Sequence, residues 1–376
     1  MTSTLLVASR REATRSVLLE RQLRRYHPRV QDQVRALAMQ HAHLADLAAS
    51  FPALLFALAL PRAGLDPAAA RACVIDGHAL ADAALAAGIP RWLPKLPPEA
   101  FAGPIPALPD DELFRRRIAN HLPRSPKLAP RWLQAVAGMA ELAHGPAAVW
   151  IARELLRDPR RVDPDRLRLL GLWAWFSTQP ATLAHTLIDR PWTPNMGIDA
   201  ALAAANEWRL LIALQVSLGA QPIADMWLQP ARVAGYDFVP LSSTADIAEE
   251  AEAMQNCLRG YGNSLAHNRL RLWSVRRDGQ RIGTLKIATS AGDPLLNITE
   301  LRGVRNTAAS REVSWAARQW LHMHDLPRID VEYRKPGAAS LDGPTWRAIW
   351  RPYWLAKRRM PHWLPIGARR AALYNL

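Results

Sequence analysis

Residues able to do chemistry are concentrated between positions 254 and 306 of the chain. A thiol, Cys257, is followed by the phenol of Tyr261, and His267 lies a short way beyond. A cysteine with a histidine base serves nucleophilic catalysis, so Cys257 and Tyr261 are candidate catalytic residues. A cysteine at an apolar helical position also commonly packs inertly in a core, and the sequence leaves both interpretations open.

A second group of candidate residues is mostly charged. Arg276 and Lys286 lie in segments that alternate like strands, and Glu300, Arg302 and Asn306 lie at the end of a third such segment. Side chains two positions apart share one face of a strand, so Glu300 and Arg302 should lie on the same side. Arginine offers planar, bidentate hydrogen bonds to phosphate oxygens. The sequence therefore predicts a phosphate or nucleotide site, with Glu300 as a further catalytic candidate.

The Arg-Gly-x-x-Asn pattern at positions 302–306 also has a purely structural explanation. Gly303 would take a positive φ in a strand-to-helix turn, and Asn306 would cap the helix that follows. The chain contains no Gly-rich phosphate loop, zinc-ligand spacing, His-Glu-x-x-His motif or Gly-x-Ser-x-Gly motif. We therefore expect no metal and no cofactor, and the sequence leaves open whether the protein is an enzyme.

A helix is expected just before the charged segments. Acidic residues between positions 246 and 252 favour a helix N-terminus, where negative charge complements the helix dipole. If this helix continues to position 261, apolar and reactive residues align along one of its sides at spacings of three and four. These residues are Met254, Cys257, Leu258 and Tyr261.

Strands and a second helix should complete a small module. Alternating residues predict strands at 271–276, 281–289 and 295–301, with a Gly-containing turn between the first two. A short extended segment at 236–241 precedes them, and a helix at 310–324 follows. The expected fold class is α+β: a mostly helical N-terminal region, then a module of helix, three antiparallel strands and helix, and finally a basic, tryptophan-rich tail.

The order of these motifs resembles the PcfJ-like family, which is found on bacterial conjugative plasmids, phages and other mobile elements. The resemblance covers about a quarter of the chain, roughly from 237 to 320. It implies a fold module and a mobile-element setting but no defined activity. Asn256 stands where relatives commonly have a histidine, and Lys286 stands where they tend to have a glutamate. The matching segments are Met254-Gln-Asn-Cys257-Leu-Arg-Gly-Tyr261, Trp273-Ser-Val-Arg276, Gly283-Thr-Leu-Lys286 and Glu300-Leu-Arg302-Gly-Val-Arg-Asn306.

The chain divides by composition into three regions. Residues 1–230 form a helical scaffold, because apolar residues recur at helical spacing on both sides of a stretch at 90–130 that is too rich in proline for long helices. We expect the tryptophans between 173 and 227 to lie in its core. Residues 231–335 form the α+β module, and residues 336–376 form the tail.

Tryptophans in the tail recur every four residues at positions 346, 350 and 354, which places them on one face of a helix. Such a face can dock on its own protein, stack on nucleic acid or lie on an anionic membrane surface. Docking back onto the α+β module is the commonest of these outcomes. The outward cations, which are candidate anion contacts, are Arg347, Arg351 and Arg358.

The overall charge narrows the class of partner. The chain has 376 residues, 48 Lys and Arg against 33 Asp and Glu, and a formal net charge of +15, which attracts polyanions. Only two cysteines and no apolar run near 18 residues suggest a reduced, cytoplasmic protein. We expect an accessory protein of a mobile element that binds nucleic acid or a nucleotide-like anion. The alternatives are an enzyme acting on a nucleotide or phosphorylated substrate through Cys257 or Glu300, and a protein-interaction scaffold.

Overall fold

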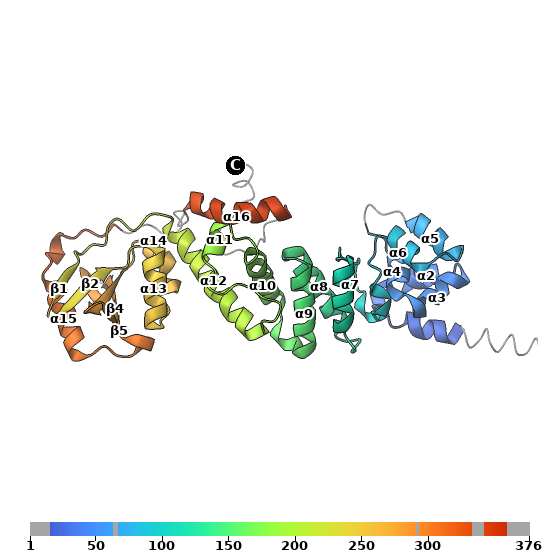
Figure 1. The fold of residues 1–376 in the computed structure, drawn as a ribbon, viewed down its shortest axis with the longest axis horizontal. Coiled ribbons are helices and arrows are strands. Elements are labelled where there is room, and N and C mark those ends of the chain that lie inside the picture. The colour runs from blue at the N-terminus through green and yellow to red at the C-terminus, as the bar shows by residue number, and fades with distance from the viewer. Residues whose placement is uncertain (1–15, 63–66, 291–292, 333–341, 359–376) are drawn as a thin grey trace, which may run out of the picture. The chain divides into compact units, whose positions relative to one another are not determined.

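The computed structural model describes residues 16–62, 67–290, 293–332 and 342–358. The chain forms two compact units (Figure 1). The first comprises Met1–Ser177 with Pro191–Leu202, and the second comprises Thr178–Arg190 with Ala203–Leu376.

The first unit is helical, as its apolar spacing predicts. Its core contains fully buried tryptophans, among them Trp132, Trp150 and Trp173, which contribute large apolar areas to the helix contacts. The proline-rich stretch at 90–130 forms short turns and the seven-residue helix α7, as expected from its missing backbone donors. The helices include α2 (Gln31–Ala38), α3 (Ala42–Ser50), α4 (Pro52–Ala59), α5 (Pro67–Ile75), α6 (Leu80–Ala86), α7 (Glu112–Ile118), α8 (Ala129–Leu142), α9 (Gly145–Arg157) and α10 (Pro164–Phe176).

The second unit is built on an antiparallel sheet of five strands in the order β1-β2-β3-β4-β5. Three of these strands were predicted, and the extended segment at 236–241 pairs as a fourth. The remaining strand, β1, has three residues, too few to show an alternating pattern, and it joins β2 through a turn in which Ala234 and Gly235 have positive φ. The strands are β1 (Ala231–Val233), β2 (Tyr236–Pro240), β3 (Arg271–Arg277), β4 (Gln280–Ser290) and β5 (Asp293–Arg302).

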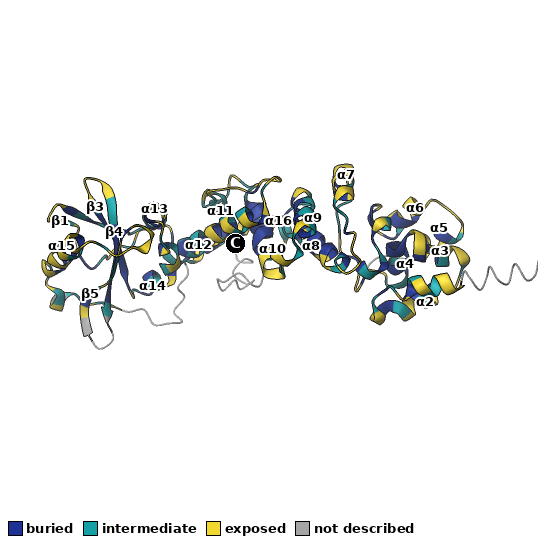
Figure 2. Ribbon diagram, turned by 90° about the horizontal axis from the view of Figure 1, so that it is seen from below, coloured by how far each residue is buried: buried dark blue, intermediate teal, exposed yellow. Residues whose placement is uncertain are grey.

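Helices cover the sheet on opposite sides (Figure 1). On one side α15 (Arg311–His322) packs through Trp320, whose ring stacks on Phe238 with centroids 4.6 Å apart, and Trp273 lies beside them. On the other side α13 (Thr244–Met254) and α14 (Gly262–Ala266) cover Leu272, which follows from the alternation of side chains along β3. Figure 2 shows that β4 is buried through much of its length.

The tryptophan-rich tail begins with a helix, α16 (Gly343–Lys357), that docks on its own protein. Trp346 and Trp350 are buried, and the Trp350 ring meets Trp208 of α12 (Ile198–Leu218) with centroids 6.4 Å apart. The docking surface is α12 and α11 (Leu183–Thr186), whereas the α+β module was the expected one. The rest of the predicted tail, 359–376, lies outside the described residues. Of the helices in the described ranges, none combines the length and apolarity that crossing a bilayer demands.

Candidate functional site

The strand register assembles polar side chains on the α13 side of the sheet. Leu272 of β3 pairs with Lys286 of β4, and Lys286 pairs with Glu300 of β5. In the neighbouring row Thr284 pairs with Arg302. Because alternate residues point to the same face, these five side chains form a patch beneath α13 and the turn that follows it.

That turn differs from the predicted continuous helix. α13 ends at Met254, because Gln255 adopts the left-handed conformation with φ 51° and closes the helix. Asn256 and Cys257 then lead into a 3₁₀ turn that ends at Tyr261. Cys257 is therefore off the helix and exposed, which excludes the interpretation of an inert cysteine packed in a core.

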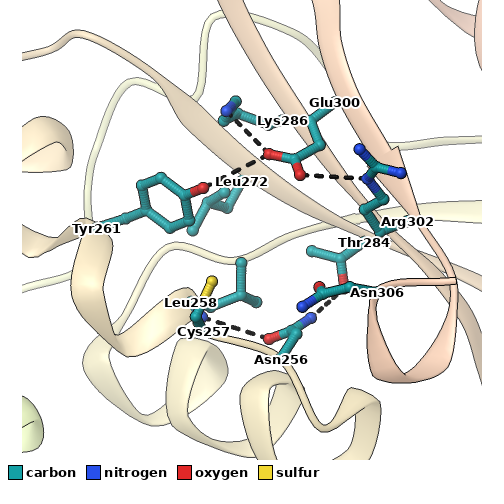
Figure 3. A pocket seen from close by; sticks show the side chains of 10 residues that line it. All are labelled: Asn256, Cys257, Leu258, Tyr261, Leu272, Thr284, Lys286, Glu300, Arg302 and Asn306. Atoms are coloured by element: carbon teal, nitrogen blue, oxygen red, sulfur yellow. Dashed lines mark hydrogen bonds and ion pairs between the residues drawn. The ribbon is translucent and has the colours of Figure 1, made fainter.

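The turn and the sheet border a small, partly open pocket, in which the space open to the centre of a water molecule is about 30 Å³, well below the volume of a site that encloses a drug-sized ligand (Figure 3). Six of the predicted site residues line it: Cys257, Tyr261, Lys286, Glu300, Arg302 and Asn306. The other lining residues are Asn256, Leu258, Leu272 and Thr284.

Glu300 is the centre of the pocket's charge network. Its carboxylate accepts a hydrogen bond from Lys286 Nζ at 2.9 Å, one from Arg302 Nε at 3.3 Å and a longer one from the Tyr261 hydroxyl at 3.5 Å (Figure 3). Lys286 also lies 5.4 Å from the centroid of the Tyr261 ring. Two cations and one carboxylate leave the group with one net positive charge.

The same contacts shift the ionisation of this group. The hydrogen bond from Lys286, with help from Arg302, holds the pKa of Glu300 below its ordinary value although partial burial opposes the shift. Burial lowers the pKa of Lys286, but the hydrogen bonds and charges of Glu300 and Tyr261 outweigh it, so this pKa lies above its ordinary value. Both groups are therefore charged at neutral pH. Lysine has three N–H donors and arginine five, so each cation retains donors beyond its bond to Glu300.

A fully buried carboxylate, Glu250, supports the pocket from α13 and was not among the predicted site residues. It accepts hydrogen bonds from Thr284 Oγ1 at 2.9 Å and from Arg281 Nε at 3.0 Å. Asn256 Nδ2 in turn donates to Thr284 Oγ1 at 3.2 Å, so the buried network orients a residue of the pocket wall. The sequence could have indicated that Glu250 is buried, because it lies three residues after Ile247 and four before Met254, on the apolar side of the helix.

The turn after β5 contradicts the structural explanation of the Arg-Gly-x-x-Asn pattern. Gly303 has φ −82°, and the left-handed residues are Arg305 and Asn306, with φ 56° and 59°. The helix α15 is capped by Ser310, whose Oγ accepts a hydrogen bond from Val313 N, so Asn306 is not its cap. Asn306 instead lines the pocket.

A contact between two left-handed residues fixes one edge of the pocket. Arg305 Nε donates to Gln255 Oε1 at 2.7 Å, which ties the turn after β5 to the end of α13. A side chain at Gly303 would meet Thr307 Oγ1 at 2.9 Å, so this position needs glycine for space rather than for a positive φ. Non-glycine residues with left-handed backbones commonly mark functional sites.

Other candidate residues lie away from the pocket. Arg276 is not among the lining residues: its Nε donates to Ser274 Oγ at 3.1 Å, and a register shift at this point of β3 pairs it with Arg281. His267, which lies beyond Cys257 in the sequence and is a possible base for it, is buried, hydrogen-bonds the Asn263 carbonyl oxygen at 2.8 Å and does not line the pocket that Cys257 lines. The three arginines of the tail are on or directly after α16: Arg347, Arg351 and Arg358.

Metal chemistry gains no support in the described part of the chain, where no group of three or more His, Cys, Asp or Glu residues could hold an ion. Comparison with protein-family models, with curated proteins and with solved structures finds no match for this chain.

Proposed function

We propose that this protein binds the phosphate groups of nucleic acid through the pocket beneath α13, as an accessory protein of a bacterial mobile element. The observation that supports binding is the convergence of Lys286 and Arg302 on one partly open pocket. The proposed setting comes from the resemblance of the motif order to PcfJ-like proteins and is a separate part of the proposal.

The chemistry of the lining residues favours an anion over a cation or an apolar ligand. Lys286 and Arg302 supply charged N–H donors, and the amides of Asn256 and Asn306 add neutral ones. Glu300 pairs with both cations, so a phosphate would compete with this carboxylate for their hydrogen bonds. The enclosed space is far too small for a whole nucleotide, so at most a phosphate group would enter and the rest of a ligand would lie outside.

The enzymatic alternative has weaker support. Cys257 is exposed at the pocket, yet no histidine is found among the described lining residues to act as its base. Glu300 is held ionised by two cations, and a carboxylate with a lowered pKa is a poor general acid near neutral pH. Binding without chemistry therefore explains the pocket better, because it requires neither a base for Cys257 nor a protonated Glu300.

The proposal is tested by neutralising the pocket without leaving an unpaired charge. The variant carries Lys286→Gln, Glu300→Gln and Arg302→Gln, and its net charge falls by one. The matched control is Arg117→Gln, an exposed residue of α7 that changes the net charge equally. Binding of a fluorescein-labelled oligonucleotide is measured by anisotropy at several salt concentrations.

We expect the triple variant to bind at least about tenfold more weakly than the control, since charged hydrogen bonds contribute roughly 1.5–3 kcal/mol each. Its salt dependence should also be shallower, because fewer phosphates are neutralised and fewer counterions are released. Equal affinities and slopes for the triple variant and Arg117→Gln would mean that the pocket does not contact phosphate.

A further inference from the structure

The outward face of α15 carries an exposed tryptophan. The helix packs against the sheet through Val313, Ala316, Ala317 and Trp320, while Trp315 is 56% exposed on the opposite side. An indole ring favours burial, so a half-exposed tryptophan on an ordered helix is a candidate contact for a partner.

Arginines surround this ring. Arg311 precedes Trp315 by one helical turn and Arg318 follows it by three residues, so all three share one side of α15. Arg277, at the end of β3, approaches the same place and lies 5.6 Å from the centroid of the Tyr236 ring. Trp315, Arg311 and Arg277 line an open hollow of about 430 Å³ together with Ala234, Tyr236 and Glu312.

The arginines of this face contrast with two other arginines of the module, Arg281 and Arg232, which pair with carboxylates. Arg281 pairs with Glu249 and Glu250, and Arg232 pairs with Asp278. Within the described ranges, Arg277, Arg311 and Arg318 form no ion pair with a carboxylate. Their charge is therefore available to an anionic partner, with Glu312 the one acidic residue among those that line the hollow.

We infer that this face binds single-stranded nucleic acid, with a base stacked on Trp315 and phosphates contacting Arg277, Arg311 and Arg318. An aromatic platform among cations suits this ligand, because every base has a π face and the backbone repeats a negative charge. A duplex hides its base faces, and an acidic peptide would leave the indole unused. The inference rests on the proposed function for its ligand class, but α15 lies across the sheet from the pocket.

The experiment uses the full chain and one fluorescein-labelled oligonucleotide sequence, as a single strand and as a duplex. Trp315→Ala should weaken single-strand binding at least about fivefold, the lower limit for one stacked base. Trp315→Phe should restore most of the affinity, and Arg318→Ala should make the single-strand salt slope shallower by about 0.7. The control is Met323→Ala, which removes another exposed apolar side chain close to the end of α15 and should change nothing.

Wild-type single-strand affinity for Trp315→Ala would overturn the inference, and so would an equal loss for the duplex, which requires no stacking. Displacement of the strand by polyglutamate from the wild-type protein and from Trp315→Ala, but not from Arg318→Ala, would show an acidic peptide site and would overturn the inference. If the pocket triple variant loses binding and Trp315→Ala does not, this inference fails while the proposed function stands. The reverse result rejects the pocket and retains the α15 face.

Discussion

At Glu300 the binding proposal predicts a gain in oligonucleotide affinity, and the enzymatic alternative predicts a loss of turnover. Under the binding proposal, Glu300→Gln frees Lys286 and Arg302 from their carboxylate partner and raises the net charge of the pocket, so oligonucleotide affinity should increase severalfold at pH 7. Under the enzymatic alternative the same change removes a reacting group. An anisotropy titration of Glu300→Gln that shows weaker binding than wild type would contradict the binding proposal.

The difference in oligonucleotide affinity between wild type and Glu300→Gln should depend on pH through the pKa of Glu300, which lies below its ordinary value. The carboxylate stays ionised above the ordinary glutamate pKa of about 4.3 and becomes neutral only as the pH falls through the lowered value. The affinity gap between wild type and Glu300→Gln should therefore persist down to about pH 5 and close only as the pH falls below the ordinary glutamate pKa. Labelled oligothymidine suits this titration, because thymine does not protonate in that range. A gap that closes between pH 7 and 5 would rule out the lowered pKa.

Residue types and spacing were sufficient to find most of the pocket but not its support. Cys257, Glu300 and Asn306 were chosen for their chemistry, and the structure brings them together. Arg276 was misplaced, because a register shift in β3 is set by hairpin pairing that alternation does not reveal. Glu250 was missed because its acidity suggested an exposed helix start, whereas its position beside apolar residues indicated burial.

At the scale of elements, the buried carboxylate of α13 makes a stability prediction. Glu250→Ala leaves Thr284 without its acceptor and Arg281 without its nearer partner, so unfolding of the module should become easier by about 2–4 kcal/mol. Glu249→Ala is the matched control, since this neighbour also pairs with Arg281 but is 70% exposed. It should cost less than about 1 kcal/mol. The free energies of unfolding of the two variants are compared by urea titration followed by circular dichroism. Equal losses for Glu250→Ala and Glu249→Ala would show that Glu250 does not support the sheet.

Element boundaries were harder to predict than element types. The helix before the first predicted strand was expected to reach position 261. It ends earlier because Gln255 takes a left-handed conformation, which the residue type does not predict. This single backbone change turns Cys257 from a helix-face residue into a pocket residue. The strand β1 was missed because three residues carry too little periodicity, although the Gly235 beside it is a common turn residue.

On the scale of the whole molecule, the net charge of +15 attracts polyanions in general, and part of the positive charge is concentrated at two sites. The pocket cations and the α15 arginines lie on opposite faces of one sheet, so a single phosphate cannot touch both. A strand that used both sites would have to pass around the module. In α16, Trp350 is buried against the protein and Arg351 is exposed. The spacing of the tryptophans predicted this division into an apolar face and a charged one.

The most direct test of the pocket uses its own thiol as a reporter. The chain has two cysteines, and only Cys257 lines the pocket, while Cys73 in the first unit serves as an internal control. Alkylation by iodoacetamide is followed at each cysteine by mass spectrometry, with and without a saturating oligonucleotide. The proposal predicts that the ligand slows alkylation of Cys257 at least about fivefold and leaves Cys73 unchanged. Alkylation of Cys257 at the same rate while the oligonucleotide is bound would contradict it.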